Sequence, residues 1–184
     1  MKASNIYDAL AAILTYPDEN YLEAVGEAAR TAPPEIEQPL QEFAHELEGK
    51  DRLELQELFT VTFDLNPVCS LELGWHLFGE NYDRGLLLVR MRELLRQHGV
   101  PESGELPDHL AHALQLIARM DAQERHDFAA AIVLPALGKM LDAFRDKPNP
   151  YQKVLEAIKT QLRSLCPEVL IFIPQAEPVL RILD

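Results

Sequence analysis

The chain has 184 residues, of which 47% are hydrophobic and 26% are charged, an ordinary composition for one globular domain that excludes disorder throughout. Its 30 Asp and Glu residues against 17 Lys and Arg residues give a formal net charge of -13. Nucleic acids and anionic membrane surfaces are bound through basic patches, so neither is expected as a partner. An acidic surface instead favours cationic partners, such as an arginine-rich peptide.

Cysteine usage and hydropathy predict a cytoplasmic protein without membrane insertion. Cys69 and Cys166 lie far apart and form no C-x-x-C pair, which favours free thiols in a reducing compartment. Asp8 interrupts the stretch in which a signal peptide needs its apolar segment. The most apolar stretch, residues 129–138, is half of the roughly 20 residues that span a bilayer.

Apolar residues recur every three or four positions along almost the whole chain, which predicts an all-α, single-domain bundle of about seven or eight helices. The first helix is expected between Ser4, as its N-cap, and Pro17, which stops it. The second is expected over about residues 20–32. Its inward face is expected to comprise Leu22, Val25 and Ala29.

The next part of the chain predicts two more helices and a break. A third helix is expected over about residues 35–47 and ends at Gly49. A fourth covers about residues 51–63, capped by its first residue, an aspartate. Residues 64–69 have the composition of a turn, and the segment after them, 71–78, is apolar and contains the only tryptophan.

A long helix is expected over about residues 80–98, with Gly99 as its C-terminal stop. The inward face of this helix is expected to comprise Tyr82, Leu86, Val89 and Leu94. A loop over residues 101–107 follows, rich in proline and glycine.

The rest of the chain predicts three helices and a tail. The helices are expected over about residues 107–120, 122–144 and 151–165, and Pro135 is expected to kink or divide the second of them. The last stretch, 167–184, contains three prolines and two apolar groups. The chain is therefore interpreted as a helical domain, 1–166, followed by a C-terminal tail, 167–184.

Motifs for catalysis are weak in this sequence. A metal-dependent helical hydrolase is one hypothesis, because residues three or four apart share a helix face; its candidate residues are His76, Glu80, His109 and His112. The metalloprotease motif H-E-x-x-H is absent, and so are the glycine-rich loops that bind phosphate. Cys69 is better interpreted as a buried thiol than as a nucleophile.

Two polar groups near aromatic residues are the stronger candidates for a binding site. Residues 71–85 place three aromatic side chains beside charged ones, a pattern of either helix core or a groove that anchors a peptide. Asp108 and His109 stand near the start of a predicted helix, where Asp108 is either a favourable charge at the helix dipole or part of a site. With the ordinary histidine pKa of about 6.5, His109 would change its charge near neutral pH, so we expect binding to depend on pH.

Three blocks of sequence carry a resemblance to a known family. They are residues 62–67 (TFDLNP), 77–85 (LFGENYDRG) and 105–110 (ELPDHL). In order and spacing they resemble the NarJ-type chaperones of respiratory nitrate reductase, which belong to the TorD/DmsD family of redox-enzyme maturation chaperones.

The resemblance implies an all-helical cytoplasmic chaperone with no enzymatic activity and no cofactor of its own. Its implied partner is the N-terminal segment of a molybdoenzyme catalytic subunit, most closely respiratory nitrate reductase. The chaperone holds the apoenzyme for molybdenum cofactor insertion before membrane docking or export. Another enzyme of the dimethyl sulfoxide reductase family stays open as the client. A monomer is the default expectation, with a dimer, or an oligomer formed through residues 167–184, as the alternative.

The resemblance also implies a peptide-binding site. Asp108 and His109 match the E-x-x-D-H signature of the wider family. The Y-x-R-G block is matched by Tyr82, Arg84 and Gly85, and the T-F-D block by Phe63 and Asp64. Position in the aromatic segment adds Trp75, His76 and Phe78 as groove candidates.

Overall fold

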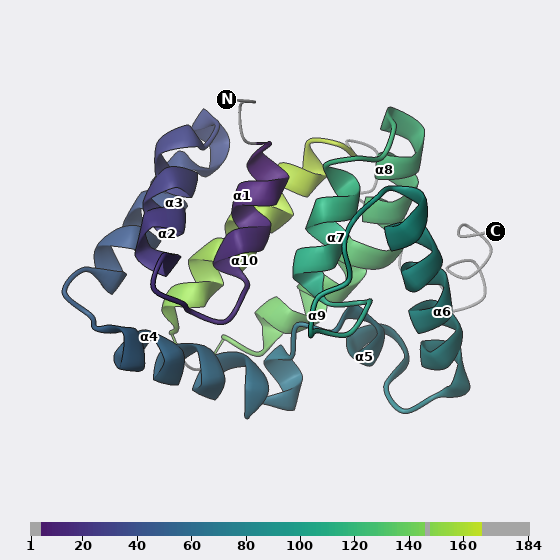
Figure 1. Ribbon diagram of the computed structural model, residues 1–184, viewed down its shortest axis with the longest axis horizontal. Coiled ribbons are helices and arrows are strands. Elements are labelled where there is room, and N and C mark those ends of the chain that lie inside the picture. Colours follow the sequence, from purple (N-terminus) through teal and green to yellow (C-terminus); the bar gives the residue numbers. More distant parts are fainter. Residues whose placement is uncertain (1–4, 146–147, 167–184) are drawn as a thin grey trace.

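Helices make up the fold of the residues that the computed structural model describes, 5–145 and 148–166 (Figure 1). With three short π or 3-10 segments marked η, they are α1 (Ile6–Ile13), α2 (Tyr21–Thr31), α3 (Pro34–Leu47), α4 (Arg52–Phe59), η1 (Thr60–Asp64), η2 (Pro67–Cys69), α5 (Leu73–Phe78), α6 (Tyr82–Gln97), α7 (Leu110–Ile117), α8 (Ala122–Phe128), η3 (Ala129–Val133), α9 (Leu134–Asp142) and α10 (Pro150–Arg163). The predicted all-α architecture is confirmed for this part of the chain. The predicted tail, 167–184, lies outside the described residues.

Local sequence explains where several helices begin and end. Asp51 opens α4 with a capping box, in which its Oδ1 accepts a 2.9 Å hydrogen bond from the Glu54 N–H and the Glu54 carboxylate accepts one from the Asp51 N–H. Asp121 caps α8 in the same way. Gly49 and Gly99 follow α3 and α6 with φ values of 77° and 64°, which glycine adopts without steric cost. These boundaries agree with the sequence predictions.

Two helix starts were predicted less well. α1 is capped by Asn5, whose Oδ1 accepts a 3.1 Å hydrogen bond from the Tyr7 N–H, whereas Ser4 lies outside the described residues. α7 begins at Leu110 and not near Pro107, because His109 is its N-cap. Asp108 therefore precedes the helix instead of standing in its first turn.

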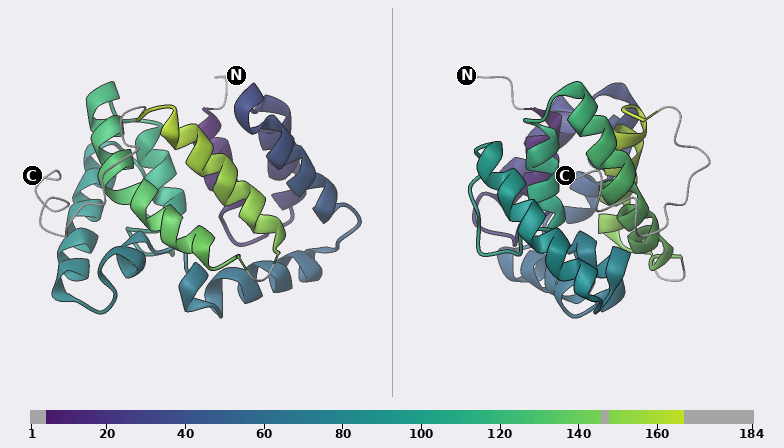
Figure 2. Two further views of the ribbon diagram at one scale, coloured as in Figure 1. Left: turned by 180° about the vertical axis from the view of Figure 1, so that it is seen from behind. Right: turned by 90° about the vertical axis from the view of Figure 1, so that its right-hand side faces the viewer.

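Helices from both halves of the chain interleave around the core. α1 packs against α2 and α7, and α10 packs against α3 and α9. Figure 1 shows α10 behind α1, and the reverse view in Figure 2 shows α10 in front, with α4 and η1 crossing the lower end of both. A buried chain of hydrogen bonds joins these helices. Tyr151 donates to the Tyr21 hydroxyl at 2.8 Å, and Tyr21 donates to the Ile13 carbonyl at 2.8 Å. Burial raises the pKa of both phenols, which keeps them protonated.

The helix predicted over residues 122–144 is interrupted by the π segment η3. The Leu134 N–H donates to the Ala129 carbonyl, five residues earlier, and Pro135 follows directly in the first turn of α9. A proline ring blocks the carbonyl of the preceding turn, and the wider π turn makes room there. The division therefore falls before Pro135 and not at it.

α6 buries a different face from the one predicted. Its buried residues are Leu87, Met91 and Leu95, and the helix contacts α5 and α7. Three of the residues predicted to face inward, Tyr82, Leu86 and Val89, are exposed instead. Apolar residues fill positions 86–89 without a gap, so their spacing fits two neighbouring faces equally well. The predicted inward residue Leu22 of α2 is exposed as well.

Helix length bears on membrane insertion. Within residues 5–145 and 148–166, no helix combines the length and the apolar character that a membrane crossing needs.

Candidate functional site

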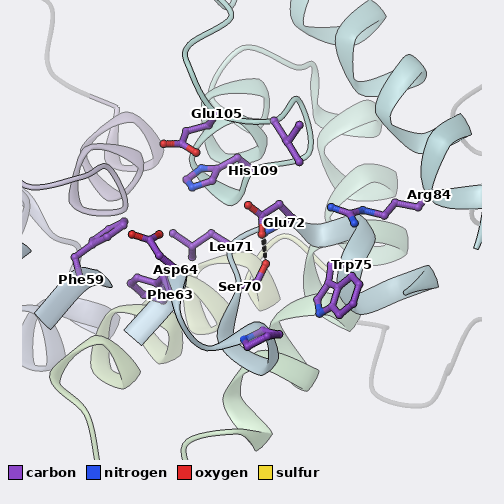
Figure 3. A pocket seen from close by; sticks show the side chains of 12 residues that line it. Phe59, Phe63, Asp64, Ser70, Leu71, Glu72, Trp75, Arg84, Glu105 and His109 are labelled. Atoms are coloured by element: carbon purple, nitrogen blue, oxygen red, sulfur yellow. Dashed lines mark hydrogen bonds between the residues drawn. The ribbon is translucent and has the colours of Figure 1, made fainter. Parts of the chain in front are cut away.

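One pocket gathers parts of all three sequence blocks that carried the family resemblance. It has a volume of about 370 Å³ and lies where η1, the segment entering α5, the start of α6 and the loop before α7 meet. Figure 3 shows Phe59 and Phe63 on one side and Trp75 with Arg84 on the other. The complete lining comprises Phe59, Phe63, Asp64, Pro67, Ser70, Leu71, Glu72, Trp75, Arg84, Glu105, Leu106 and His109.

Backbone pairing holds two walls of the pocket together. Glu72 and His109 form an isolated antiparallel β-bridge. The Leu110 N–H donates to the Leu71 carbonyl at 2.8 Å, and the Leu73 N–H donates to the Asp108 carbonyl at 3.0 Å. These bonds fix the Glu72 and His109 side chains next to each other, although they come from distant parts of the sequence.

Asp108 lies beneath the pocket and not in its wall. Its side chain is completely buried, and its Oδ2 accepts a 2.8 Å hydrogen bond from the Gly74 N–H. A Cβ atom on Gly74 would lie 2.7 Å from this oxygen, so the close approach requires glycine. Burial raises the pKa of Asp108 above its ordinary value, although the Gly74 N–H and the Arg84 charge favour the carboxylate. Asp108 thus joins the first turn of α5 to the start of α7.

Three carboxylates make the pocket acidic. They belong to Asp64, Glu72 and Glu105, against Arg84 as the basic residue of the described lining. Glu72 accepts a hydrogen bond from the Ser70 hydroxyl (Figure 3). Burial raises the pKa of Glu72, and the negative charges of its neighbours, including Glu105, add to that rise. A cation bound here would offset this repulsion.

Arg84 and Trp75 form the opposite wall. The Arg84 Cζ lies 5.6 Å from the centroid of the Trp75 ring, within the range of a cation–π contact. The buried Arg84 Nε has no hydrogen-bond partner among the described residues. The aromatic ring is therefore a main partner of the guanidinium, and it presents an apolar surface beside a positive charge.

His109 is a buried, neutral residue. Its Nδ1 accepts a 3.2 Å hydrogen bond from the Ala111 N–H, so the ring proton sits on Nε2. Burial lowers the pKa of His109 to about 4. The expectation of an ordinary pKa near 6.5 is therefore wrong, because the ring has lost the water that stabilises its charged form.

His112 braces the loop that carries Glu105 and Leu106. Its Nδ1 donates to the Leu106 carbonyl at 2.9 Å, and its Nε2 lies 3.0 Å from the Ser103 hydroxyl. Ser103 Oγ in turn accepts a 3.1 Å hydrogen bond from the Glu105 N–H. With a neutral ring the Ser103 hydroxyl donates to Nε2, and every polar atom in this network is satisfied.

The structure brings together half of the candidate residues that the sequence predicted. The candidates that line the pocket are Phe63, Asp64, Trp75, Arg84 and His109. Those outside its lining are Asp108, just beneath it, and Tyr82, Gly85, His76 and Phe78. Close helix packing does not explain Gly85, because a Cβ there would meet no atom within 4 Å. Gly74 is the glycine that has this role.

The other lining residues were not among the candidates from the sequence: Phe59, Pro67, Ser70, Leu71, Glu72, Glu105 and Leu106. Glu72 was the hardest to find, because its pairing with His109 is long-range and leaves no local pattern. The signal that could have drawn attention to this segment is Gly74, a glycine inside an apolar helical stretch, which points to a close approach of another group.

The four residues of the hydrolase hypothesis do not form a metal site. His76 uses Nε2 to bind the Ser70 carbonyl at 2.6 Å, and both ring nitrogens of His112 are engaged in the loop. In the part of the chain that the structure describes, no group of three or more His, Cys, Asp or Glu side chains is arranged to hold a metal ion. The geometry therefore does not support this hypothesis.

The fold is similar to that of a solved protein involved in enzyme maturation. The structure matches the crystal structure of a putative redox enzyme maturation protein from Archaeoglobus fulgidus with a TM-score of 0.61. The match covers 89% of this chain and 96% of that chain at 22% sequence identity, and at this identity it shows a shared fold. The chain itself belongs to the nitrate reductase delta subunit family, whose profile matches residues 28–159.

Two curated relatives give the family a more specific context. Both are named nitrate reductase molybdenum cofactor assembly chaperone NarJ, one from Escherichia coli strain K12 and one from Escherichia coli O157:H7. Each is 33% identical over 120 residues, which cover 61% of this chain and 50% of the relative. The chain therefore spans about half the length of the curated relatives it matches. The resemblance to the NarJ-type family is confirmed.

Proposed function

We propose that the protein is an assembly chaperone for a molybdoenzyme of the nitrate reductase type. In this proposal the pocket binds the N-terminal segment of the catalytic subunit. The chaperone then holds the apoenzyme until the molybdenum cofactor is inserted, before the enzyme docks at the membrane or is exported. It carries no cofactor and catalyses no reaction itself.

The observation that carries the proposal is the convergence of the three family blocks on one pocket. Residues 62–67, 77–85 and 105–110 are separated by other elements in the sequence, yet each contributes to the lining. The names of the two NarJ relatives support the same assignment. Loops on a rigid scaffold are a common place for binding residues, and two of the walls are loops.

The pocket offers the two kinds of contact that a basic, amphipathic peptide needs. Leu106, which is exposed, and Trp75, which is half-buried, provide apolar surface, which suits the Leu or Phe side chains of a helix that forms on binding. Glu72 and Glu105 provide carboxylates, which suit Lys or Arg. Ordering a flexible segment costs free energy, so the affinity is moderate and release is easy. The net charge of -13 speeds the encounter and makes binding salt-sensitive.

Calorimetry with the full chain tests the proposal. The ligand is a synthetic peptide with the N-terminal sequence of a nitrate reductase catalytic subunit, measured at low and at high salt. The Glu72→Gln and Glu105→Gln double variant should weaken binding about three- to tenfold at low salt, the range of partly exposed charge pairs. Trp75→Ala should weaken it equally at both salt concentrations, because it removes apolar surface.

A matched control separates the pocket from the general acidity of the chain. Glu19 and Glu48 are exposed and lie outside the pocket, so Glu19→Gln with Glu48→Gln removes the same charge elsewhere. This control should bind like the wild type. Equal weakening in both double variants would contradict the pocket as the site. Binding only to the peptide of another dimethyl sulfoxide reductase-family enzyme would change the client, and failure across a panel of such peptides would end the proposal.

A further inference from the structure

Arg84 occupies an unfavourable position at the edge of the acidic pocket. It is the third residue of α6, so its positive charge stands at the helix end where the backbone dipole is also positive. Among the described residues its guanidinium forms no ion pair, and its buried Nε has no hydrogen-bond partner. A buried polar atom without a partner costs free energy. A residue that breaks several local rules at once points to a function.

The contacts that Arg84 does make cover two parts of the pocket. Its Cζ lies 5.6 Å from the centroid of the Trp75 ring, and Figure 3 shows the guanidinium pointing towards Glu72. Burial raises the pKa of Glu72, and the Arg84 charge opposes that rise. Arg84 therefore covers part of an apolar surface and partly offsets the charge of a carboxylate.

These are the two contacts that a basic, amphipathic client segment needs. Its Lys or Arg would approach the carboxylates of Glu72 and Glu105, and its Leu or Phe would pack on the Trp75 ring. A like charge beside the first position raises the free energy of the complex. On the ring, the Arg84 guanidinium has to leave before another side chain can pack on the same face. Arg84 and the segment thus require the same space and the same negative potential.

We propose that Arg84 is an internal competitor for the client segment, an inference that rests on the proposed function. In the free protein, Arg84 covers the Trp75 ring and partly neutralises Glu72. In the complex, a basic side chain of the client replaces the Arg84 charge, and an apolar one replaces the guanidinium on the ring. Arg84 thereby determines specificity, because a segment that provides only one of these side chains does not replace both contacts.

The lack of an ion pair makes this exchange possible. Bidentate pairs between arginine and a buried carboxylate are strong, and breaking them is costly. Arg84 forms no such pair in the described part of the chain, so its displacement breaks mainly the cation–π contact with Trp75. Arg84 is half-buried, and a long arginine side chain can turn its charged end to water while its stem stays packed.

Calorimetry with the synthetic nitrate reductase peptide tests the proposal through the sign of the effect. Arg84→Gln removes the competing charge, so it should strengthen binding about three- to tenfold at low salt, a change typical of a partly exposed charge at close range. The gain should shrink at high salt, because the added ions screen the charge. Arg84→Lys keeps the positive charge and should therefore gain less than Arg84→Gln.

Two further variants serve as controls. Arg84→Met also removes the charge but keeps an unbranched stem beside Gly74, where the Arg84 Cγ packs closely, so it should show the same gain even if Arg84→Gln does not fold. Arg30→Gln removes an equal charge from an exposed position on α2, where Arg30 pairs with Glu27 outside the pocket. This control should bind like the wild type. Circular dichroism identifies the variants that are folded.

A second measurement needs no client peptide. Trp75 is the only tryptophan of the chain, so its fluorescence reports on the ring that Arg84 covers. Argininamide, a small cation with a guanidinium group, should change this fluorescence in a saturable way, with potassium chloride at equal ionic strength as the blank. The midpoint of the titration should lie about three- to tenfold lower in Arg84→Gln than in the wild type.

The outcomes separate this inference from the proposed function. Weaker peptide binding by Arg84→Gln would overturn the inference and would assign Arg84 to a carboxylate of the client. Unchanged peptide binding by this variant would overturn it as well, and both results would leave the proposed function in place. If the peptide binds to none of the proteins, the proposed function fails. The argininamide titration then decides, and equal midpoints or an unchanged fluorescence would overturn the inference too.

Discussion

Asp108 and Gly74 are in direct contact across two segments that lie far apart in the sequence. The Gly74 N–H donates to the Asp108 Oδ2 at 2.8 Å, and the carboxylate fills the space that any other side chain at position 74 would need. The contact fixes α5 against the start of α7, and with it the relative position of Glu72 and His109 in the pocket.

Gly74→Ala should therefore destabilise the protein by about 1–3 kcal/mol, the usual cost of overpacking a buried site. Gly85→Ala is the matched control. It lies inside α6 with no atom within 4 Å of an added Cβ, so it should stabilise the protein by about 0.5–1 kcal/mol through helix propensity. Urea unfolding measures both, and a neutral Gly74→Ala would contradict the close approach. Unchanged peptide binding by Gly85→Ala would also remove Gly85 from the candidate site residues.

Asp108→Asn should gain stability relative to the wild type as the pH rises. Burial raises the pKa of Asp108 in the folded state, so above the ordinary pKa of about 4 the folded protein holds a proton that the unfolded chain has lost. The free energy of unfolding of the wild type therefore falls as the pH rises through the folded pKa, and the variant lacks this loss. Urea unfolding at several pH values measures the difference. Free energies of unfolding that change with pH in the same way for both proteins would show that the folded-state pKa of Asp108 is ordinary.

Asp108→Ala should behave differently, because it leaves the buried Gly74 N–H without an acceptor. The expected loss is about 1–3 kcal/mol in the free energy of unfolding at neutral pH. The two Asp108 variants together separate the hydrogen bond from the charge. A loss of peptide affinity in the folded Asn variant would assign the charge a role in binding.

His109→Asn should reduce the loss in the free energy of unfolding that occurs as the pH falls. The folded-state pKa of His109 is about 4, below the ordinary value of about 6.5. The stability tied to the neutral ring is therefore present above pH 6.5 and is lost as the pH falls towards 4, by up to about 3 kcal/mol. Asn keeps a side-chain acceptor for the α7 cap but does not titrate. Thermal or urea unfolding between pH 4 and 7 measures the effect, and an equal acid loss in both proteins would assign it to other groups.

His112→Ala should weaken peptide binding without contacting the peptide. It releases the Leu106 carbonyl and Ser103, so residues 103–106 should exchange their amide hydrogens faster and the affinity should fall about three- to tenfold. Ser103→Ala removes one of the two bonds to the ring and should give a smaller effect of the same kind. Unchanged amide hydrogen exchange in residues 103–106 would contradict this stabilising role of His112.

Short-range signals made much of the fold predictable. The N-cap at Asp51 and the stop at Gly49 depend on neighbours within a few residues, so they can be read directly from the sequence. The face of α6 is different, because residues 86–89 are all apolar and only the tertiary packing selects Leu87 as the buried one. Periodicity cannot resolve a helix whose apolar residues run without a gap.

The site was predictable only in part for a related reason. The family motifs pointed to Asp108 and His109, but a motif does not show that one of them lies beneath the pocket and the other in its wall. Glu72 has no motif, and its place depends on a backbone bridge to His109. The low pKa of His109 arises from burial, a property of the folded chain that residue type alone does not reveal.

The π turn of η1 has a consequence for comparing chains of this family by sequence. Its 3.0 Å bond from the Leu65 N–H to the Thr60 carbonyl spans one residue more than an α-helical bond. Loss of one residue between 60 and 64 would restore a regular helix, and each residue beyond it would turn by about 100° around the axis. A one-residue gap in an alignment at this point would thus signal a rebuilt pocket wall, in which another side chain replaces Asp64, and not a harmless shortening of a loop.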